Sequence, residues 1–346
     1  MAKTYTLRFQ SFSRIIHVRT VIVVAILLCL TFAHILLSLS LGKVPTSLSQ
    51  VLQELFSPEK GAYGFIIETL RFPRIIMAAF VGASLSLSGL ILQSIVRNPL
   101  ASPDILGITT GASASTIFFM SFLAPFLSMQ LLPVFAMLGA WLSAFLIYML
   151  AWKQGVTPNR LIMIGIGMSA VMSAVTTLLL VLSPLTSSLS AYVWLTGSVY
   201  GTIWQDVRYF AIWLIILLPF LLYVGRWLNV HELDDSIMQG LGLQPERERM
   251  WLLLLAVAFA AIAVAYAGAI AFVGLIAPHI ARRLVARSFA GLAWTSTLIG
   301  ANLVMLADLI GRTAFLPLDL PAGIFVAVMG TPFFVYLLIK QQHRVR

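Results

Sequence analysis

The chain is 346 residues long, and 60% of its residues are hydrophobic, only 10% are charged and the formal net charge is +10. An ordinary soluble domain has about 25% charged residues, so this composition excludes a soluble globular protein and predicts a polytopic membrane protein. A membrane span needs about 20 apolar residues, so the length holds about ten spans and leaves no room for a sizeable soluble domain. The single cysteine, Cys29, excludes an internal disulfide.

Long apolar segments follow one another along the whole chain, and most contain no Asp, Glu, Lys or Arg. The first segment follows a basic N-terminal stretch but is longer than a usual signal-peptide core, so it is interpreted as a retained span. We expect an all-α polytopic membrane protein with one transmembrane domain covering residues 1–346. The expected spans are 21–41, 72–94, 105–123, 131–151, 160–182, 207–225, 250–267, 271–286, 292–310 and 322–339.

The positions of the basic residues indicate an orientation. An even number of spans places both termini on one side, and only six of the 22 Lys and Arg residues then fall on the other side: Lys43, Lys60, Arg71, Arg74, Arg208 and Arg312. Because cytoplasmic loops are rich in Lys and Arg, both termini are predicted to be cytoplasmic, in a multi-pass protein of the plasma (inner) membrane. The net positive charge is interpreted as the Lys and Arg residues of membrane loops that set the topology, and not as a nucleic-acid binding surface.

Two loops expected outside are long. Residues 42–70 are polar enough for a surface excursion, and 183–204 carry no charge and predict a turn and a short helix near the membrane.

Residues 226–249, between the sixth and seventh spans, form the longest loop expected on the cytoplasmic side. Apolar residues recur there at helical spacing, and Gly242 is well placed to end a helix. Glu232, Asp234 and Asp235 suit its N-terminus, where the helix dipole favours negative charge. Acidic flanks suit a protein partner better than anionic lipid.

That partner would have to supply the energy for any transport. The chain contains no G-x-x-x-x-G-K-[ST] loop, so it is not expected to hydrolyse ATP itself. It also shows no carboxylate in the middle of a predicted span, which argues against a carrier driven by protons or sodium.

Several spans carry small or helix-breaking residues. Gly165, Ser169 and Ser173 lie in the fifth span, and Gly268, Gly274 and Pro278 are expected to break the seventh and eighth. Such residues either line a cavity or allow close helix packing, and the sequence leaves both readings open. The stretch from Gly82 to Ile91 resembles that from Gly268 to Ile276, which is a faint indication of inverted repeats.

A proline-bounded turn follows the second span, and a lone histidine lies in the eighth. Asn98 and Asp104 flank the turn, which is expected to be structural, with Asp104 capping the third span. His279 forms no i,i+4 pair with another histidine and is expected to be a packed, hydrogen-bonded residue. The sequence predicts no metal site and no cofactor.

Five segments in order resemble the signatures of the iron-siderophore and cobalamin ABC importer permeases, the FecCD-type family. These are RFPRIIMAAFVGASLSLSGLILQSIVRNPLASPDILGITTGA (71–112), WLTGSVYG (194–201), FVGLIAPHIAR (272–282), ADLIGRT (307–313) and LPAGIFVAVMGTPFFVYLL (320–338). The run RNPLASPDILGI is most similar to the ferric-citrate and ferric-hydroxamate members.

The resemblance implies the type II ABC importer permease fold, with ten transmembrane helices per subunit. It implies a permease subunit, not an enzyme, and a complex with two ABC ATP-binding subunits, a second permease subunit that is identical or homologous, and an extracytoplasmic siderophore-binding protein, all in membrane lipid. The implied cargo is a ferric siderophore of the Fe(III)-citrate or hydroxamate type.

The resemblance also implies roles for residues of this chain. Coupling to the ATPase falls to Leu233, Ile237, Met238, Gly240, Leu241 and Gly242. Binding-protein docking falls to Arg71, Arg74 and Arg312, which are also outside cations at span ends. The translocation pathway is assigned to Gly165, Ser169, Ser173, Trp194, Gly197 and Tyr200.

Three alternatives remain at this point. A cobalamin or haem importer would share the fold and the mechanism. An intramembrane serine protease would use Ser169, in a G-x-S string, as its nucleophile and His279 as its base. A secondary carrier would need no ATPase.

Overall fold

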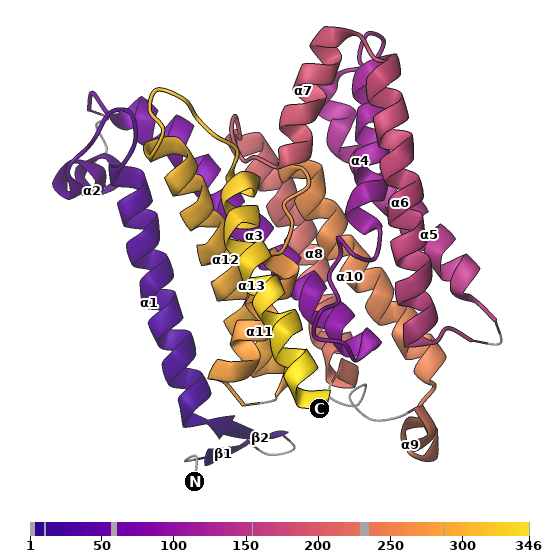
Figure 1. Cartoon of the computed structure of the whole chain (residues 1–346). Coiled ribbons are helices and arrows are strands. Elements are labelled where there is room, and N and C mark those ends of the chain that lie inside the picture. The colour runs from indigo at the N-terminus through magenta and orange to yellow at the C-terminus, as the bar shows by residue number, and fades with distance from the viewer. Residues whose placement is uncertain are drawn as a thin grey trace.

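The structure is a computed structural model, and it describes residues 4–9, 12–56, 61–153, 155–228, 235–286 and 288–345. The described residues form a helical bundle, with both described ends at the same side (Figure 1). We call this the terminal side and the opposite one the far side. The all-α prediction is confirmed for the bundle. The sequence analysis did not predict the two strands beneath α1, where β1 and β2 pair as an antiparallel hairpin.

The elements follow the expected spans closely. In chain order they are β1 (Thr4–Phe9), β2 (Phe12–His17), α1 (Val18–Ser40), α2 (Leu48–Phe56), the π-helical turn η1 (Phe65–Arg71), α3 (Phe72–Val96), α4 (Ile108–Phe118), the π-helical turn η2 (Phe119–Leu123), the short 3-10 turn η3 (Met129–Leu131), α5 (Leu132–Ala151), α6 (Pro158–Leu182), α7 (Leu185–Thr196), α8 (Trp204–Leu228), α9 (Asp235–Gly240), α10 (Pro245–Ala267), α11 (Val273–Leu284), α12 (Phe289–Thr313) and α13 (Ala322–Val345).

Eight helices in the described part of the chain are long and apolar enough to cross a membrane. The third and eighth expected spans correspond to shorter elements, namely Ile108–Leu123 and the 12-residue α11. Of the residues expected to break the seventh and eighth spans, only Gly268 lies at the break; Gly274 and Pro278 lie within α11. The two long outside loops contain α2 and α7, at the far side (Figure 1).

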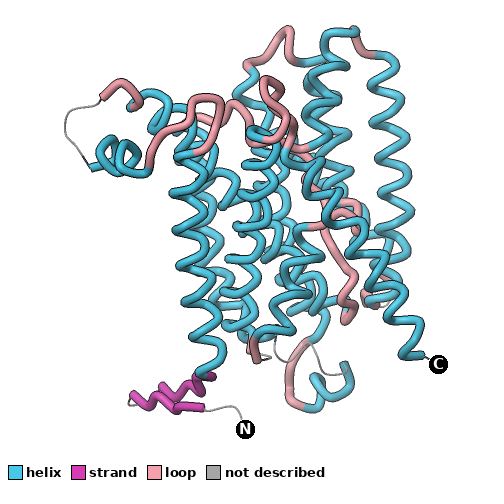
Figure 2. The backbone as a smooth tube through the Cα atoms, turned by 60° about the vertical axis from the view of Figure 1, so that its left-hand side comes forward, coloured by secondary structure: helices cyan, strands magenta, loops and turns pink. Residues whose placement is uncertain are grey.

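The helices differ strongly in burial. In their apolar windows, 78% of α3 and 72% of α10 is buried, against 11% for α6 and none for α1. α3 and α10 therefore lie in the middle of the bundle, and in α3 small residues let the neighbouring helices come close. The tube view places α1 at one edge above the hairpin (Figure 2).

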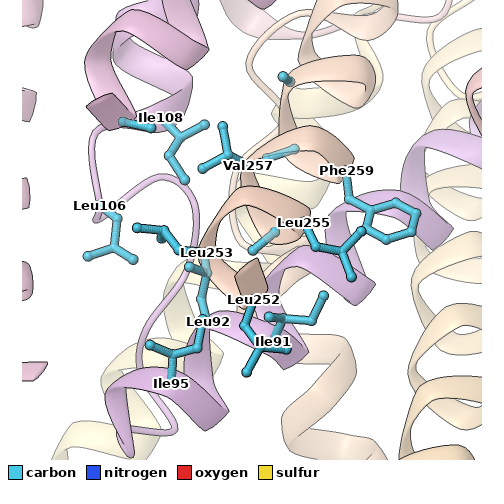
Figure 3. Close-up of a cluster of buried hydrophobic side chains, with 14 of the residues drawn as sticks. Ile91, Leu92, Ile95, Leu106, Ile108, Leu252, Leu253, Leu255, Val257 and Phe259 are labelled. Carbon is cyan, nitrogen blue, oxygen red and sulfur yellow. The ribbon is translucent and has the colours of Figure 1, made fainter. Parts of the chain in front are cut away.

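The centre of the bundle is an apolar cluster built mainly by α3 and α10. Ile91 and Ile95 of α3 belong to it with Leu252 of α10, and Val257 of α10 lies beside Ile108 at the start of α4 (Figure 3). All five side chains are almost completely buried.

Glycines allow α3 to approach its neighbours closely. A Cβ on Gly82 would lie 2.1 Å from the carbonyl oxygen of Gly300 in α12, and one on Gly89 would lie 1.9 Å from that of Gly274 in α11. Close helix packing is therefore the role of these positions, as in other membrane helix contacts. Gly89 and Gly274, related by the sequence echo, face each other; the inverted repeat itself stays a prediction.

Candidate functional site

A buried cluster of charges lies at the far side, where α3 begins. The guanidinium group of Arg74 donates to Asp308 of α12 at 2.8 Å and to both carboxylate oxygens of Asp319 at 2.8 Å. Bidentate pairs of this kind are among the strongest hydrogen-bonded contacts. The face of the Tyr200 ring lies 5.4 Å from the same guanidinium group. We call Arg74, Asp308, Asp319 and Arg312 the far-side cluster.

Two further arginines fasten the C-terminal end of α1. Arg312 lies one helical turn after Asp308, at 3.7 Å from its carboxylate, and donates to the carbonyl oxygens of Ser38 and Leu41. Arg71 donates to the carbonyl oxygen of Leu39 at 2.6 Å. Basic side chains commonly satisfy the last carbonyls of a helix in this way, which explains why these residues are arginines.

This arrangement bears on the predicted docking residues. Arg71, Arg74 and Arg312 are only 6%, 8% and 6% exposed, and their donors bind groups within the chain. Their direct contact with a binding protein stays a prediction. Among the described residues of the far side, Lys43 and Arg208 are the exposed basic ones.

Sequence reasoning missed the acidic members of this cluster. Asp308 lies near the end of the ninth expected span, 292–310, and the sequence analysis had looked for carboxylates only in the middle of spans. The available signal was the i,i+4 spacing between Asp308 and Arg312. Asp319 lies in the loop after α12; burial raises its pKa, but Arg74 outweighs burial and holds the pKa of that carboxyl below its ordinary value.

The residues predicted to line the pathway on α6 separate into two groups. A Cβ on Gly165 would lie 3.0 Å from the Cα of Leu106, and the hydroxyl of Ser169 faces Gly107. Both positions therefore pack α6 against the loop before α4. Ser173 is exposed on the outer surface of α6.

The other predicted pathway residues surround the end of α7. Trp194 and Tyr200 line a pocket of about 340 Å³ together with Asp206 and Tyr266. Tyr200 is 70% exposed. Gly197 does not line this pocket; it makes the turn after α7 with φ +77°, and its carbonyl accepts from Gly323 of α13.

The expected cap on the third span is wrong. Asp104 accepts a hydrogen bond from the backbone N–H of Phe272 at 3.2 Å, where the chain breaks between α10 and α11. Phe272 has φ +65°, an uncommon conformation for a bulky residue. The N-cap of α4 is Gly107 and not Asp104, whose side chain hydrogen-bonds both Thr109 in the first turn of α4 and the entry to α11. Asn98 does make the expected turn and accepts from Leu100 N–H at 2.9 Å.

His279 is packed as expected, edge to face against Phe333 at 5.6 Å between ring centroids. Its Nε2 atom is buried without a hydrogen-bond partner in the described part of the chain, so the expected hydrogen bond is not made at that nitrogen. Ser169 faces Gly107 and His279 faces Phe333, and these different neighbours give no sign of a nucleophile–base pair.

The predicted coupling segment forms the short helix α9, which projects from the terminal side (Figure 1). Met238 is fully buried and anchors the helix, whereas Ile237 and Leu241 are 50% and 63% exposed. Gly242 ends the turn with φ +77°, the left-handed conformation that favours glycine. Gly240 has open space around it, and Leu233 lies outside the described residues.

A second charge cluster holds α9 against the bundle. Asp235 accepts from Arg97 at 2.6 Å and from Arg249 at 3.0 and 3.1 Å. Burial raises the pKa of Asp235, but the hydrogen bonds and charges of Arg249 and Arg97 outweigh it and hold the pKa below its ordinary value. We call Asp235, Arg97 and Arg249 the terminal-side cluster. Sequence reasoning had assigned Asp235 only to the helix dipole.

The comparisons with known proteins agree with this architecture. The family model described as the FecCD transport family matches residues 27–340. The chain is 54% identical to an achromobactin transport system permease protein of Dickeya dadantii, over 96% of this chain and 95% of that protein. It is 41% identical to an iron(3+)-hydroxamate import system permease protein of Bacillus subtilis, over 93% and 98% of the two chains.

Among solved structures, the chain is similar to a metal-chelate type ABC transporter in an inward-facing conformation. The TM-score is 0.80 and the identity 29%, covering 93% of this chain and 99% of that one. A transporter and not an enzyme was predicted, and these relatives confirm that prediction and overturn the serine protease alternative. The chain belongs to the FecCD transport family.

Proposed function

We propose that this chain is the membrane permease subunit of an ABC importer for a ferric siderophore. The observation that carries the proposal is the 54% identity, over almost the whole length of both chains, to a permease protein for achromobactin transport. Further relatives are named for iron(3+)-hydroxamate and iron(3+)-citrate import. Ferric achromobactin is therefore the first chelate to test, followed by hydroxamate and citrate complexes.

A permease of this kind works with ATP-hydrolysing and substrate-binding partners. The assembly that we propose contains two permease subunits, two ATP-binding subunits and one extracytoplasmic binding protein. The terminal side is the cytoplasmic one in this proposal, in accord with the distribution of Lys and Arg. The single permease domain then spans 1–346, with residues 226–249 as the cytoplasmic coupling loop.

The coupling surface is proposed to be the outward face of α9. Ile237 and Leu241 are apolar and at least half exposed, beside Gly240 and Gly242, which leave open space for an approaching surface. Exposed apolar side chains on a small projecting helix fit a cleft in a partner protein. Leu241→Asp places a charge in this exposed apolar surface and should release the ATP-binding subunits from the permease in a pull-down from detergent. A wild-type yield would overturn the coupling surface.

The translocation pathway is proposed to run along the exposed face of α6 and the pocket lined by Trp194 and Tyr200. Met163 and Val181 on α6 are 74% and 76% exposed, and Ser173 lies among them. A sparsely charged wall suits a large chelate that must be released. A second permease subunit would cover this face, and lipid would cover α1.

Docking of the binding protein is proposed at the far side. Lys43 and Arg208 are exposed there and offer the charge complementarity that steers an acidic partner. Arg71, Arg74 and Arg312 would then act mainly by holding the shape of that surface. Neutralising Lys43 and Arg208 together should slow association of the binding protein and reduce its dependence on salt.

The decisive experiment is radio-iron uptake in cells with and without this chain, using achromobactin, hydroxamate, citrate and catecholate chelates, with labelled cobalamin alongside. Loss of one ferric chelate supports the proposal and identifies the substrate. Loss of cobalamin uptake instead would overturn the cargo while keeping the fold. No loss for any of them would contradict an importer role in those cells.

A further inference from the structure

The terminal-side cluster joins three elements that are far apart in sequence. Arg97 ends α3, Asp235 begins α9 and Arg249 lies in the first turns of α10. A single carboxylate accepts from both arginines, at 2.6 Å from Arg97 and at 3.0 and 3.1 Å from Arg249. The coupling helix is therefore tied to the two most buried helices of the bundle.

Arg249 extends this connection to α6. Its guanidinium group is only 1% exposed and also donates to the carbonyl oxygen of Val156, two residues before α6 begins at Pro158. The N–H of Val156 in turn donates to Glu246 of α10 at 3.0 Å. Both backbone polar groups of Val156 are thus held by side chains of α10.

Arg97 ends α3 in a backbone conformation that an arginine seldom adopts. Arg97 has φ +53°, a left-handed conformation in which glycine or asparagine is favoured. An arginine here bears a steric cost, and its side chain reaches Asp235. Strain of this kind persists where the surrounding structure requires that residue.

We infer that Asp235 is a positioning residue that couples α9 mechanically to the start of α6 through Arg249 and Val156. The inference rests on the proposed coupling role of α9 and deepens it. When the ATP-binding subunits move α9, the shared carboxylate makes α3, α10 and the start of α6 follow. Without this carboxylate, α9 still binds the ATPase through Ile237 and Leu241, but α6 follows the movement of α9 only in part.

The test is transport by the complete complex in lipid vesicles, with the chelate moved and the ATP hydrolysed measured in the same sample. Asp235→Asn keeps the size of the side chain and removes its charge. We expect the chelate transported per ATP to fall about fivefold, the lower end of typical coupling between sites, with ATPase association unchanged. Asp235→Glu should restore most of the ratio. An unchanged ratio in Asp235→Asn would overturn the inference.

Two matched variants separate the side-chain contact from general damage. Arg97→Asn suits the left-handed backbone and removes the guanidinium group, so a lower ratio there reports the lost contact. Arg247→Gln removes the same charge from α10, two residues from Arg249, at an exposed position. We expect Arg97→Asn to resemble Asp235→Asn and Arg247→Gln to resemble the wild type; equal loss in both would contradict the proposed link.

A spectroscopic measurement tests the motion directly. In a Cys29→Ser background, spin labels at Ser236 on α9 and Asn159 on α6 report the distance between the two helices, and both positions are exposed. We expect a narrow distance distribution with and without ATP, and a broad one in Asp235→Asn. An equally narrow distribution in Asp235→Asn would overturn the inference.

Two variants distinguish an error about the positioning role of Asp235 from an error about α9 as the surface that binds the ATP-binding subunits. If Leu241→Asp leaves ATPase association intact, α9 is not the coupling helix. If Leu241→Asp releases the ATPase but Asp235→Asn transports normally per ATP, only the positioning role is wrong.

Discussion

The two charge clusters lie at opposite ends of α3 and differ in how far they are closed to water. In the far-side cluster, the side chains of Arg74, Asp308 and Arg312 are 9%, 2% and 7% exposed, and that of Asp319 is 18% exposed. In the terminal-side cluster, those of Arg97 and Asp235 are 27% and 39% exposed, whereas that of Arg249 is 1% exposed. The same residue types therefore make a buried fastening at one end and a partly hydrated joint at the other.

The difference matches the work that each end is proposed to do. Removing one member of a buried charge network leaves an uncompensated charge, so the far side resists rearrangement. The Arg97–Asp235 pair is partly exposed, so breaking it costs little stability, while the buried Arg249 keeps its contact with Val156. α3 connects the two, since Arg74 lies in its first turn and Arg97 is its C-cap.

The largest expected effect comes from breaking the far-side cluster. Asp308→Asn leaves Arg74 and Arg312 without the full charge that faces them, and we expect a loss of about 3–5 kcal/mol in the free energy of unfolding. Thermal unfolding of the purified chain in detergent measures it. Lys43→Gln, exposed at the same side, is the control. A melting temperature unchanged in Asp308→Asn would contradict the buried network.

The second largest effect is expected where α3 packs against α11, between the two clusters. Gly89→Ala places a Cβ against the backbone of Gly274, and we expect a loss of about 1–3 kcal/mol because α3 and α11 must separate. Gly167→Ala on α6, where nothing lies within 4 Å, is the matched control and should be neutral or slightly stabilising. Equal melting temperatures for the two variants would refute the close approach.

A smaller loss of stability, one that depends on salt and pH, is expected when the terminal-side cluster is broken. Asp235→Asn is expected to cost about 1 kcal/mol in low salt and less in high salt, as for a partly exposed ion pair. Because the pKa of Asp235 is lowered in the folded chain, its contribution is full at neutral pH and is lost as the pH falls below about 4. The measurement is the difference in unfolding free energy between the wild type and Asp235→Asn, followed from pH 7 downward. A difference that grows on acidification would have the wrong sign.

The smallest effect is expected at Arg247. It is exposed two residues from the buried Arg249, so Arg247→Gln should change the free energy of unfolding by no more than about 0.5 kcal/mol. Chemical denaturation of the purified chain is precise enough to bound the change. A loss similar to that of Asp235→Asn would mean that charge density at this end, and not the specific contact, holds α9.

The sequence by itself determined the features that depend on local pattern. Apolar segments of sufficient length predicted the spans, and the acidic start and Gly242 predicted a short helix in the coupling loop. These predictions succeeded because membrane spans satisfy their backbone hydrogen bonds internally, so length and composition decide them. The α11 helix was harder, since its 12 residues are too few to be recognised by length.

Only the tertiary structure decided which charged and polar groups meet. Arg74 and Asp308 are separated by 234 positions, and Asp104 and Phe272 by 168, so no spacing in the sequence relates them. Arg71 and Arg312 look like surface cations at span ends, yet both reach the last carbonyls of α1. The physical reason is that a buried charge is tolerated only with partners, and close packing at glycines brings distant partners together.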